Sequence, residues 1–535
     1  MSSDLLAGLE SWKRSFGTAD PAQLERLLED IAGYSFSDAG SLIRLHEDLL
    51  FLRAYPATPG VARLADQILY RFAARVEALR ADGRDLTPFE ESEVSGIAGT
   101  CFSAVFSYAA ARSISMRRPG NFDINWDAWD TDNLGSLLRR FVPLMDEDWP
   151  VEAHVPYRAW FDAGRKRGQT DLAWLLNGIG KLPLLSREQA ELYDSLRVPL
   201  LWDLGADPAS RSCLRLPGSS RFFHREPLIR RSEVSLRREL DSPPLPVNRV
   251  PRKDAGRILE LIVDTSAMRY RELYGFNHPE KAGMIRAELG RGVEVFFFGV
   301  PPEWRLPLRA YHAGMFFKNG VPAGYIETLS LFERSEIGFN LYYTFREGES
   351  AWLYVRLLKL VHQLLGTTCF SVDPYQIGRD NPEAIESGAF WFYRKLGFRP
   401  LDPQVRRVLA LEEKRMFRDP GHRSSRKTLQ RLADGYILWD GNGDHPGDWD
   451  RFRVRDIGLA AHRRGSCDGS GFESMLKLIP GLDRWSQSER DGISTIMEAK
   501  QSSQDEARYL RLTQGHPRLR AAVVKLGSGI PSGSG

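Results

Sequence analysis

The chain has 535 residues, of which 42% are hydrophobic and 27% charged, which is typical of a globular protein. This length exceeds one ordinary hydrophobic core, so we expect two or three domains. The 73 basic and 70 acidic residues leave a formal net charge of +3, and this near balance argues against nucleic-acid binding as the main task.

The longest stretch of small apolar residues, at about 96–111, is shorter than the roughly 20 residues that a membrane-spanning helix needs, so we expect a buried core helix there. The first residues are polar and contain no apolar signal segment. The four cysteines are too scattered for a CxxC metal site or a disulfide framework. The sequence therefore predicts a cytoplasmic protein with no membrane partner and no metal.

Residues 1–240 are expected to form a mostly helical N-terminal domain. Several segments place apolar residues at helical spacing with charges on the opposite face. Asp20–Pro21 and Ser37–Asp38 are typical helix starts, because Asp and Ser accept hydrogen bonds from the first turn and Pro suits its first position. The acidic and aromatic segment 121–133 lacks the oxygen spacing, the turn glycine and the closing glutamate of a calcium loop, so we expect a structured loop.

Two boundaries follow from composition. Residues 241–253 are rich in proline, which favours an extended linker. Just before it, arginines between 211 and 238 alternate with glutamates; phosphate binding is one interpretation, and a solvated or interdomain face is the one favoured. A Gly- and Asp-rich segment begins at 439, so we expect a small helical region over 439–526 and a disordered tail over 527–535.

The central segment 254–438 changes from a helix to strand-like runs rich in aromatic and β-branched residues. The expected strands are 293–300, 309–320, 321–332 and 335–345, with Asn319–Gly320 as a hairpin turn because both residues tolerate positive φ. A helix over 351–366 and a short strand over 368–373 should follow. The last clear helix is expected to begin at Asn381–Pro382 and to run without a break to Gly397.

Two segments carry a family resemblance. Leu341–Leu360 resembles the strand, loop and helix with which acyl-CoA N-acyltransferases of the GNAT superfamily bind the cofactor pyrophosphate, and Ala389–Phe398 (AFWFYRKLGF) is similar to a later helix of that family. The order of the elements fits as well. The resemblance implies an α+β fold: a GNAT-like, mixed but mainly antiparallel sheet flanked by helices, preceded by the helical domain and followed by the small helical region.

The resemblance also implies an activity. The donor would be acetyl-CoA or another acyl-CoA, and the acceptor an amine-bearing small molecule or protein. A helix N-terminus offers unpaired N–H groups and partial positive charge to phosphate oxygens. The best register places Phe345 where the family has Gln or Arg, with Gly348 and Ser350 at its two small residues. The implied cofactor-binding residues are Phe345, Arg346, Glu347, Gly348, Glu349, Ser350 and Ala351.

The resemblance assigns to Tyr393 the role of general acid, protonating the departing thiolate; the alternative is simple packing on an apolar helix. The acceptor amine must lose a proton, and Glu327 is the first candidate for the base because it interrupts an apolar strand, where burial would raise the pKa of its carboxyl. The alternative places Glu327 on the exposed face. Asp373 is the second candidate, or else a cap at Pro374, and His362 is better interpreted as a packed core residue.

Two other functions stay open at this point. A related fold transfers aminoacyl groups from aminoacyl-tRNA, and arginines before the linker would then contact phosphates; the near-neutral charge argues against this. A non-catalytic binding or regulatory protein on a GNAT-like fold is the other, since fold alone does not fix function.

Overall fold

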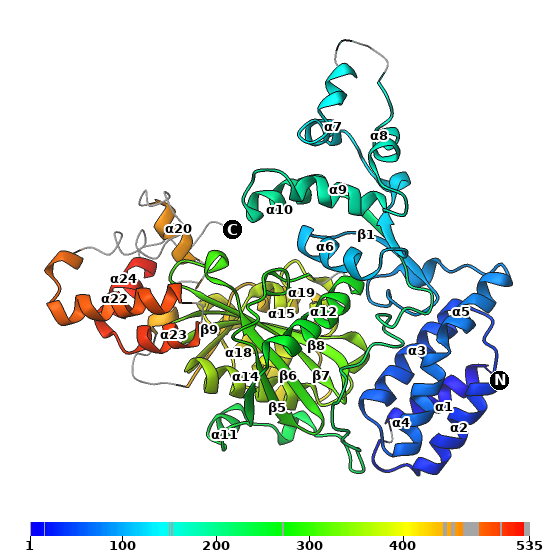
Figure 1. The fold of residues 1–535 in the computed structure, drawn as a ribbon. Helices are drawn as coiled ribbons and strands as arrows, with labels where there is room; N and C mark the ends of the chain where they lie inside the picture. Colours follow the sequence, from blue (N-terminus) through cyan, green and yellow to red (C-terminus); the bar gives the residue numbers. More distant parts are fainter. Residues whose placement is uncertain are drawn as a thin grey trace. The chain divides into compact units, whose positions relative to one another are not determined.

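The computed structural model describes residues 2–14, 16–148, 150, 154–269, 272–441, 447–450, 454, 456–463, 481–502 and 506–528. The chain forms two compact units (Figure 1). Unit 1 comprises Met1–Pro227, Gly256–His278 and Lys318–Pro322, and unit 2 comprises Leu228–Ala255, Pro279–Phe317 and Ala323–Gly535. The fold is α+β, with an antiparallel and a mixed sheet. The five-part domain division expected from the sequence stays a prediction.

The first part of unit 1 is a bundle of five helices, and their starts follow the sequence signals. Asp20 accepts a hydrogen bond from the Ala22 N–H, and Asp38 accepts one from the Ser41 N–H, as expected for helix caps. The apolar faces of these helices meet in the interior. The helices are α1 (Ser2–Arg14), α2 (Pro21–Gly33), α3 (Ala39–Ala54), α4 (Pro59–Tyr70) and α5 (Phe72–Ala81).

A small antiparallel sheet follows in unit 1. Its strands β1 (Cys101–Val105), β2 (Phe122–Ile124) and β3 (Pro199–Asp203) are ordered β1-β3-β2 among the described residues. The prediction of one buried helix over 96–111 was therefore wrong in the middle of that range, where residues 101–105 form β1. Phe102 and the fully buried Trp202 pack together across this sheet, so pairing and tertiary burial outweigh the helical preference of the alanines.

The remaining elements of unit 1 are helices and 3₁₀ turns, and most of them contribute side chains to the aromatic core packed against this sheet. They are the 3₁₀ turns at Thr87–Glu90, Trp126–Ala128 and Pro143–Asp148, and the helices α6 (Tyr108–Arg117), α7 (Leu134–Leu138), α8 (Tyr157–Gly164), α9 (Asp171–Gly180), α10 (Ser186–Ser195), α12 (Arg252–Met268, from Gly256 on) and α13 (Tyr274–Asn277). The acidic segment 121–133 contains β2 and the turn at Trp126–Ala128.

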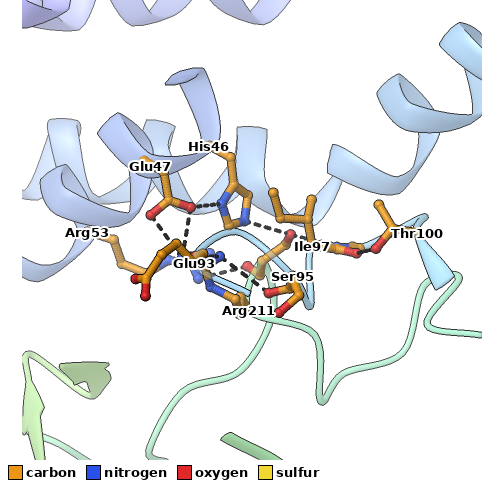
Figure 2. Close-up of polar contacts among 10 residues, drawn as sticks. His46, Glu47, Arg53, Glu93, Ser95, Ile97, Thr100 and Arg211 are labelled. Carbon is orange, nitrogen blue, oxygen red and sulfur yellow. Dashed lines mark hydrogen bonds and ion pairs between the residues drawn. The ribbon is translucent and has the colours of Figure 1, made fainter. Parts of the chain in front are cut away.

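A buried polar network links α3 to the chain around residue 211 (Figure 2). His46 Nδ1 lies 3.1 Å from a Glu47 carboxylate oxygen, and its Nε2 lies 3.0 Å from the Ser212 hydroxyl. Arg211 donates to both Glu47 oxygens, at 2.8 and 2.9 Å. Burial lowers the pKa of His46 to about 4, more than the attraction of Glu47 raises it. His46 is therefore neutral at pH 7. Its two hydrogen bonds are consistent with this, because one partner is an acceptor and the other is a hydroxyl that can donate.

The low pKa of His46 predicts a specific loss of stability in acid. The unfolded chain, with an ordinary histidine pKa of about 6.5, binds more protons than the folded chain below that pH, so stability is lost as pH falls from 6.5 toward 4. We expect the unfolding free energy of unit 1 to fall by about 3 kcal/mol more in the wild type than in His46→Gln between pH 7 and 4. Denaturant titrations of both proteins measure this, and identical pH dependence would contradict it.

Unit 2 is built on one mixed sheet, which in the described residues has nine strands in the order β11-β12-β10-β9-β8-β7-β6-β5-β4. The pairings of β4 with β5, β5 with β6, β8 with β9, β10 with β12 and β11 with β12 are antiparallel, and β9 with β10 is parallel. The strands are β4 (Val247–Arg249), β5 (Ile285–Gly290), β6 (Val293–Gly299), β7 (Ala310–Lys318), β8 (Val321–Leu331), β9 (Arg334–Leu341), β10 (Cys369–Val372), β11 (Arg399–Pro400) and β12 (Ile437–Asp440).

The hairpin turn at Asn319–Gly320 is confirmed. Both residues have positive φ, 49° and 79°, as a tight turn between β7 and β8 requires. The Asn319 side-chain amide donates to the carbonyl oxygens of Ala54, at 2.7 Å, and Phe222, at 3.0 Å, which groups the tip of the hairpin with unit 1.

Helices join and cover the strands of unit 2. The long helix after β9 ends at Gly366 with φ 71°, as expected. The helices are α11 (Leu236–Leu240), α14 (Ser350–Leu365), α15 (Pro374–Ile377), α16 (Pro382–Glu386), α17 (Ala389–Arg394), α18 (Pro403–Arg418), α19 (Arg426–Leu432), α20 (Asp456–Arg463), α22 (Gln487–Gln501), α23 (Ala507–Gln514) and α24 (Pro517–Ser528), with 3₁₀ turns at Arg231–Glu233, Pro302–Trp304, Tyr343–Phe345, Asp448–Asp450 and Leu482–Arg484.

Two local predictions need correction, and a third falls mostly on residues outside the described ranges. The Pro-rich segment 241–253 is not only a linker, because Val247–Arg249 pairs with β5. The helix expected from Asn381 to Gly397 is broken into α16 and α17, since Gly388 adopts φ 65° between them. Most of the tail 527–535, expected to be disordered, lies outside the described residues.

Candidate functional site

The candidate site lies where β9 and β10 part. The two strands pair only from Arg334 to Glu336 on β9. Beyond Glu336, β9 continues to pair with β8, while β10 continues along β12. Among the described residues, no parallel strand therefore pairs with the edge of β9 from Ile337 to Leu341. Backbone N–H and C=O groups on such an edge must find other partners.

A cavity of about 680 Å³ opens beside this edge. Its walls come from β8, β9, the loop after β9, the start of α14 and the segment from Asp373 to Tyr393. This volume falls in the range of small-molecule binding sites. The residues predicted from the sequence that line it are Glu327, Arg346, Ser350, Asp373 and Tyr393.

Glu327 lies on β8, opposite Gly338 of β9. A side chain at position 338 would begin 3.4 Å from Glu327, so the glycine leaves room for the carboxylate beside the cavity. Burial raises the pKa of Glu327, and a hydrogen bond from the Tyr311 hydroxyl opposes that rise. Glu327 is half-buried and lines the cavity, which is the environment expected of a base with a raised pKa.

Tyr393 lies on α17 and is 4% exposed, with its ring held by other aromatic rings. The ring centroids of Tyr354 and Phe392 lie 5.4 and 5.2 Å from that of Tyr393, both edge-on. Burial raises the pKa of the Tyr393 phenol, which therefore keeps its proton at neutral pH. Packing and a role as proton donor are compatible here, because the same side chain also lines the cavity.

Of the seven residues predicted to bind the cofactor, Arg346 and Ser350 line the cavity. Ser350 is the first residue of α14, and no side chain caps this helix at Glu349. The other five are not among the lining residues: Phe345 is fully buried, Glu349 and Ala351 are buried, Glu347 is exposed and Gly348 is half-buried. The predicted loop thus reaches the cavity through two side chains and the start of the helix.

Two charged side chains of this loop form ion pairs with other residues of unit 2. Glu349 is 1% exposed; its carboxylate accepts from the Ile229 N–H at 3.1 Å and pairs with Arg291 at 2.6 Å. Arg291 and the Ile229 N–H thereby compensate the negative charge of Glu349. Arg346 pairs with Glu383, and its Nε donates to the Leu341 carbonyl oxygen at 3.3 Å. The guanidinium group of Arg346 is therefore in the cavity wall but already shared with a carboxylate.

The two other candidate bases differ in position. Asp373 lines the cavity and caps α15, since it accepts from the Tyr375 N–H at 2.8 Å. The Tyr436 hydroxyl also donates to Asp373, at 2.8 Å. His362 is not among the lining residues, and its Nδ1 lies 2.7 Å from the Thr367 carbonyl oxygen. His362 is half-buried, so the prediction of a packed core histidine was wrong in its degree of burial; the side chain instead contacts the backbone at the end of α14.

Gln376 also lines the cavity, and no sequence pattern marks it as a site residue. Its side-chain Nε2 donates to the Ile337 carbonyl oxygen at 2.8 Å, and its Oε1 accepts from the Phe339 N–H at 3.0 Å. The amide of Gln376 thus pairs with the edge of β9 that β10 leaves. A glutamine in a short helix carries no sequence signal for such a contact, because the contact depends on where two strands separate.

A second group of residues, in unit 1, resembles a catalytic triad of nucleophile, histidine and acid. His46 lies within hydrogen-bond distance of the Glu47 carboxylate (Figure 2) and, through its other ring nitrogen, of the Ser212 hydroxyl. Ser212 and His46 are fully buried, and the Ser212 hydroxyl also accepts from the Ala98 N–H at 3.0 Å. A substrate carbonyl has no access to a hydroxyl held in this way, so the arrangement is a structural network.

Among the described residues, no group of three or more His, Cys, Asp and Glu is arranged to hold a metal ion. The helices in the described ranges are too short or too polar to cross a membrane. Comparisons with family models, curated proteins and solved structures find no match for this sequence.

The contact of Gln376 with β9 leads to a prediction. Gln376→Ala removes both hydrogen bonds, so the Phe339 amide should exchange with solvent faster and stability should fall by about 1–3 kcal/mol. Gln363→Ala is the matched control, because Gln363 makes the same pair of hydrogen bonds with the backbone of Leu245. Hydrogen exchange read by mass spectrometry should show faster exchange at 337–341 only in the first variant. Unchanged exchange there would contradict the assigned contact.

Proposed function

We propose that unit 2 is a GNAT-type N-acyltransferase domain that transfers an acetyl or other acyl group from acyl-CoA to an amine. The observation that carries the proposal is one cavity, beside the parting strands β9 and β10, lined together by Glu327, Tyr393 and the first residue of α14. These residues are far apart in the sequence. Each of them was selected from the sequence for a separate part of the same reaction.

The start of α14 suits the diphosphate of the donor. Its first-turn N–H groups and the positive end of the helix dipole favour an anion, and no side chain caps them. Ser350 adds a hydroxyl and Arg346 a guanidinium group at the same wall. The carboxylate of Glu349 does not oppose this binding, because it is buried against Arg291.

The edge of β9 suits the extended amide-containing arm of acyl-CoA. An extended chain with amide groups can pair with an open strand edge as a further strand would. The Ile337 carbonyl and the Phe339 N–H are the groups on that edge, and Gln376 now satisfies them with a side-chain amide of the same chemistry. Donor binding along this edge therefore exchanges one amide partner for another.

The reaction then needs a proton acceptor and a proton donor. Glu327 takes a proton from the acceptor ammonium group, and the free amine attacks the thioester carbonyl carbon to form the new C–N bond. As the C–S bond breaks, the departing thiolate takes the phenolic proton of Tyr393. The nitrogen, which carries an extra proton after the attack, loses that proton through water to the Tyr393 phenolate, and Glu327 releases its own proton to solvent. Glu327 and Asp373 give the cavity negative charge that attracts a cationic acceptor.

The second candidate is a non-catalytic binding protein on the same fold. Two contacts favour it: Arg346 is already paired with Glu383, and Gln376 already occupies the β9 edge. A protein that no longer binds the donor would keep both contacts permanently. Donor binding and turnover separate the two functions.

We predict that acetyl-CoA raises the melting temperature of the protein. A ligand that binds only the folded state at one hundred times its Kd adds about 2.7 kcal/mol, enough for a shift of a few degrees. Ser350→Glu places a carboxylate in the cavity and should abolish the shift, while Ser350→Ala should keep most of it. Scanning fluorimetry measures this, and no shift of the wild type at millimolar acetyl-CoA favours the non-catalytic protein.

We also predict distinct kinetic effects of the two catalytic residues. Tyr393→Phe should lower kcat by about 10²-fold or more with little change in acetyl-CoA affinity, because the ring packing is kept and the proton donor is lost. The raised pKa of Glu327 should give a rate that increases with pH above the ordinary range of a carboxyl, and Glu327→Gln should remove that dependence. Initial rates of CoA release against pH test both, and full activity of either variant removes its residue from the mechanism.

A further inference from the structure

A second cavity, of about 640 Å³, lies wholly within unit 1 and has a different chemistry. It is bounded by the end of α6, the segment from Pro208 to Arg221 and one face of α12. Five arginines from these three parts of the chain are among its lining residues: Arg117, Arg118, Arg215, Arg221 and Arg257. The cavity has the size of a small-molecule site.

One wall of this cavity carries more positive than negative charge. Asp66 receives three guanidinium groups, from Arg53 at 2.7 Å, Arg215 at 2.8 Å and Arg221 at 2.9 Å. A single carboxylate compensates only one of these three charges. Arg53 is almost completely buried behind the wall, so its charge adds to the potential without screening by water.

At the end of α6, the positive and negative charges are closer to equal in number. Arg117 forms a bidentate pair with Asp264, with both contacts at 2.7 Å. Arg118 contacts Asp264 at 3.1 Å and Asp207 at 2.8 Å. These two arginines and two carboxylates hold α6 against α12 and the segment around residue 207.

Arg257, on α12, makes no ion pair or hydrogen bond with any other described residue. It lines the cavity and is exposed, and Glu260 is the next acidic residue on the same helix. Together with their ion-pair partners, the lining residues comprise six guanidinium groups and four carboxylates, those of Asp66, Asp207, Glu260 and Asp264. The imbalance is concentrated in a concave site, where an anion gains the most from it.

We infer that this cavity binds a small molecule that carries phosphate groups. Guanidinium groups present pairs of N–H donors that match phosphate oxygens, and the five arginines converge from separate segments, as a built site requires. Leu214, Leu216 and Leu261 line the same cavity and give an organic part of the ligand an apolar contact. A long polyanion is disfavoured, because the chain as a whole has a net charge of only +3.

The inference does not depend on the acyltransferase proposal, since no residue of the cavity in unit 2 takes part. It gives a specific role to Arg215 and Arg221, for which the sequence favoured a solvated or interdomain face and left phosphate binding as the other interpretation. The other class of ligand for such a surface, a nucleic acid, is an outcome of the test below.

The test uses inorganic diphosphate with the full-length protein, titrated by calorimetry at fixed ionic strength. We expect diphosphate to bind the wild type, and Arg257→Ala to weaken binding about tenfold, which corresponds to the loss of about one charge-assisted hydrogen bond. Because Arg257 pairs with no described residue, its removal leaves the other ion pairs intact. Arg221→Gln should weaken binding to a similar degree.

The matched control is Arg63→Ala, on α4 of the same unit, whose side chain is exposed and outside the cavity. Its affinity for diphosphate should equal that of the wild type. The inference is overturned if the wild type binds no diphosphate at millimolar concentration, or if Arg63→Ala and Arg257→Ala weaken binding equally. It is also overturned if a 20-nucleotide single strand binds more tightly than diphosphate and Arg257→Ala leaves that binding unchanged.

Discussion

The parting of β9 and β10 is the constraint from which the site in unit 2 follows. Parallel neighbours need a crossover connection, and here α14 supplies it between the end of β9 and the start of β10. The helix must therefore begin at the end of β9 where the strands separate. An open strand edge, an uncapped helix start and a cavity between them are thus consequences of a single topological feature.

Some charged side chains around that opening are held in ion pairs, and others remain available to a ligand. The Glu349 carboxylate, which would oppose an anion at the start of α14, is taken up by Arg291 and the Ile229 N–H. Arg346 is shared with Glu383 in the wall. Glu327, half-buried beside Gly338, keeps a carboxyl of raised pKa at the cavity. The cavity in unit 1 has the opposite character, with several guanidinium groups per carboxylate around Asp66.

Local sequence signals predicted the parts of the fold that local chemistry decides. The Asn319–Gly320 turn, the caps at Asp20 and Asp38 and the end of α14 at Gly366 each depend on one residue's conformational preference or hydrogen bond. The strand β1 and the break at Gly388 were missed, because pairing with β3 and a left-handed glycine inside an apolar helix are decided by tertiary context. Glu327 was selected because it interrupts an apolar strand, and Tyr393 because of the family resemblance, and both line the cavity. Gln376 and the burial of Phe345 depend on the shape of the opening and carry no such signal.

The proposed function requires that the β9 edge and the start of α14 together receive the acyl donor. Hydrogen exchange, read by mass spectrometry with and without saturating acetyl-CoA, measures this. We expect slower exchange at 337–341 and in the first turn of α14, with little change in unit 1. Unchanged exchange at both places, or protection confined to other segments, would contradict it.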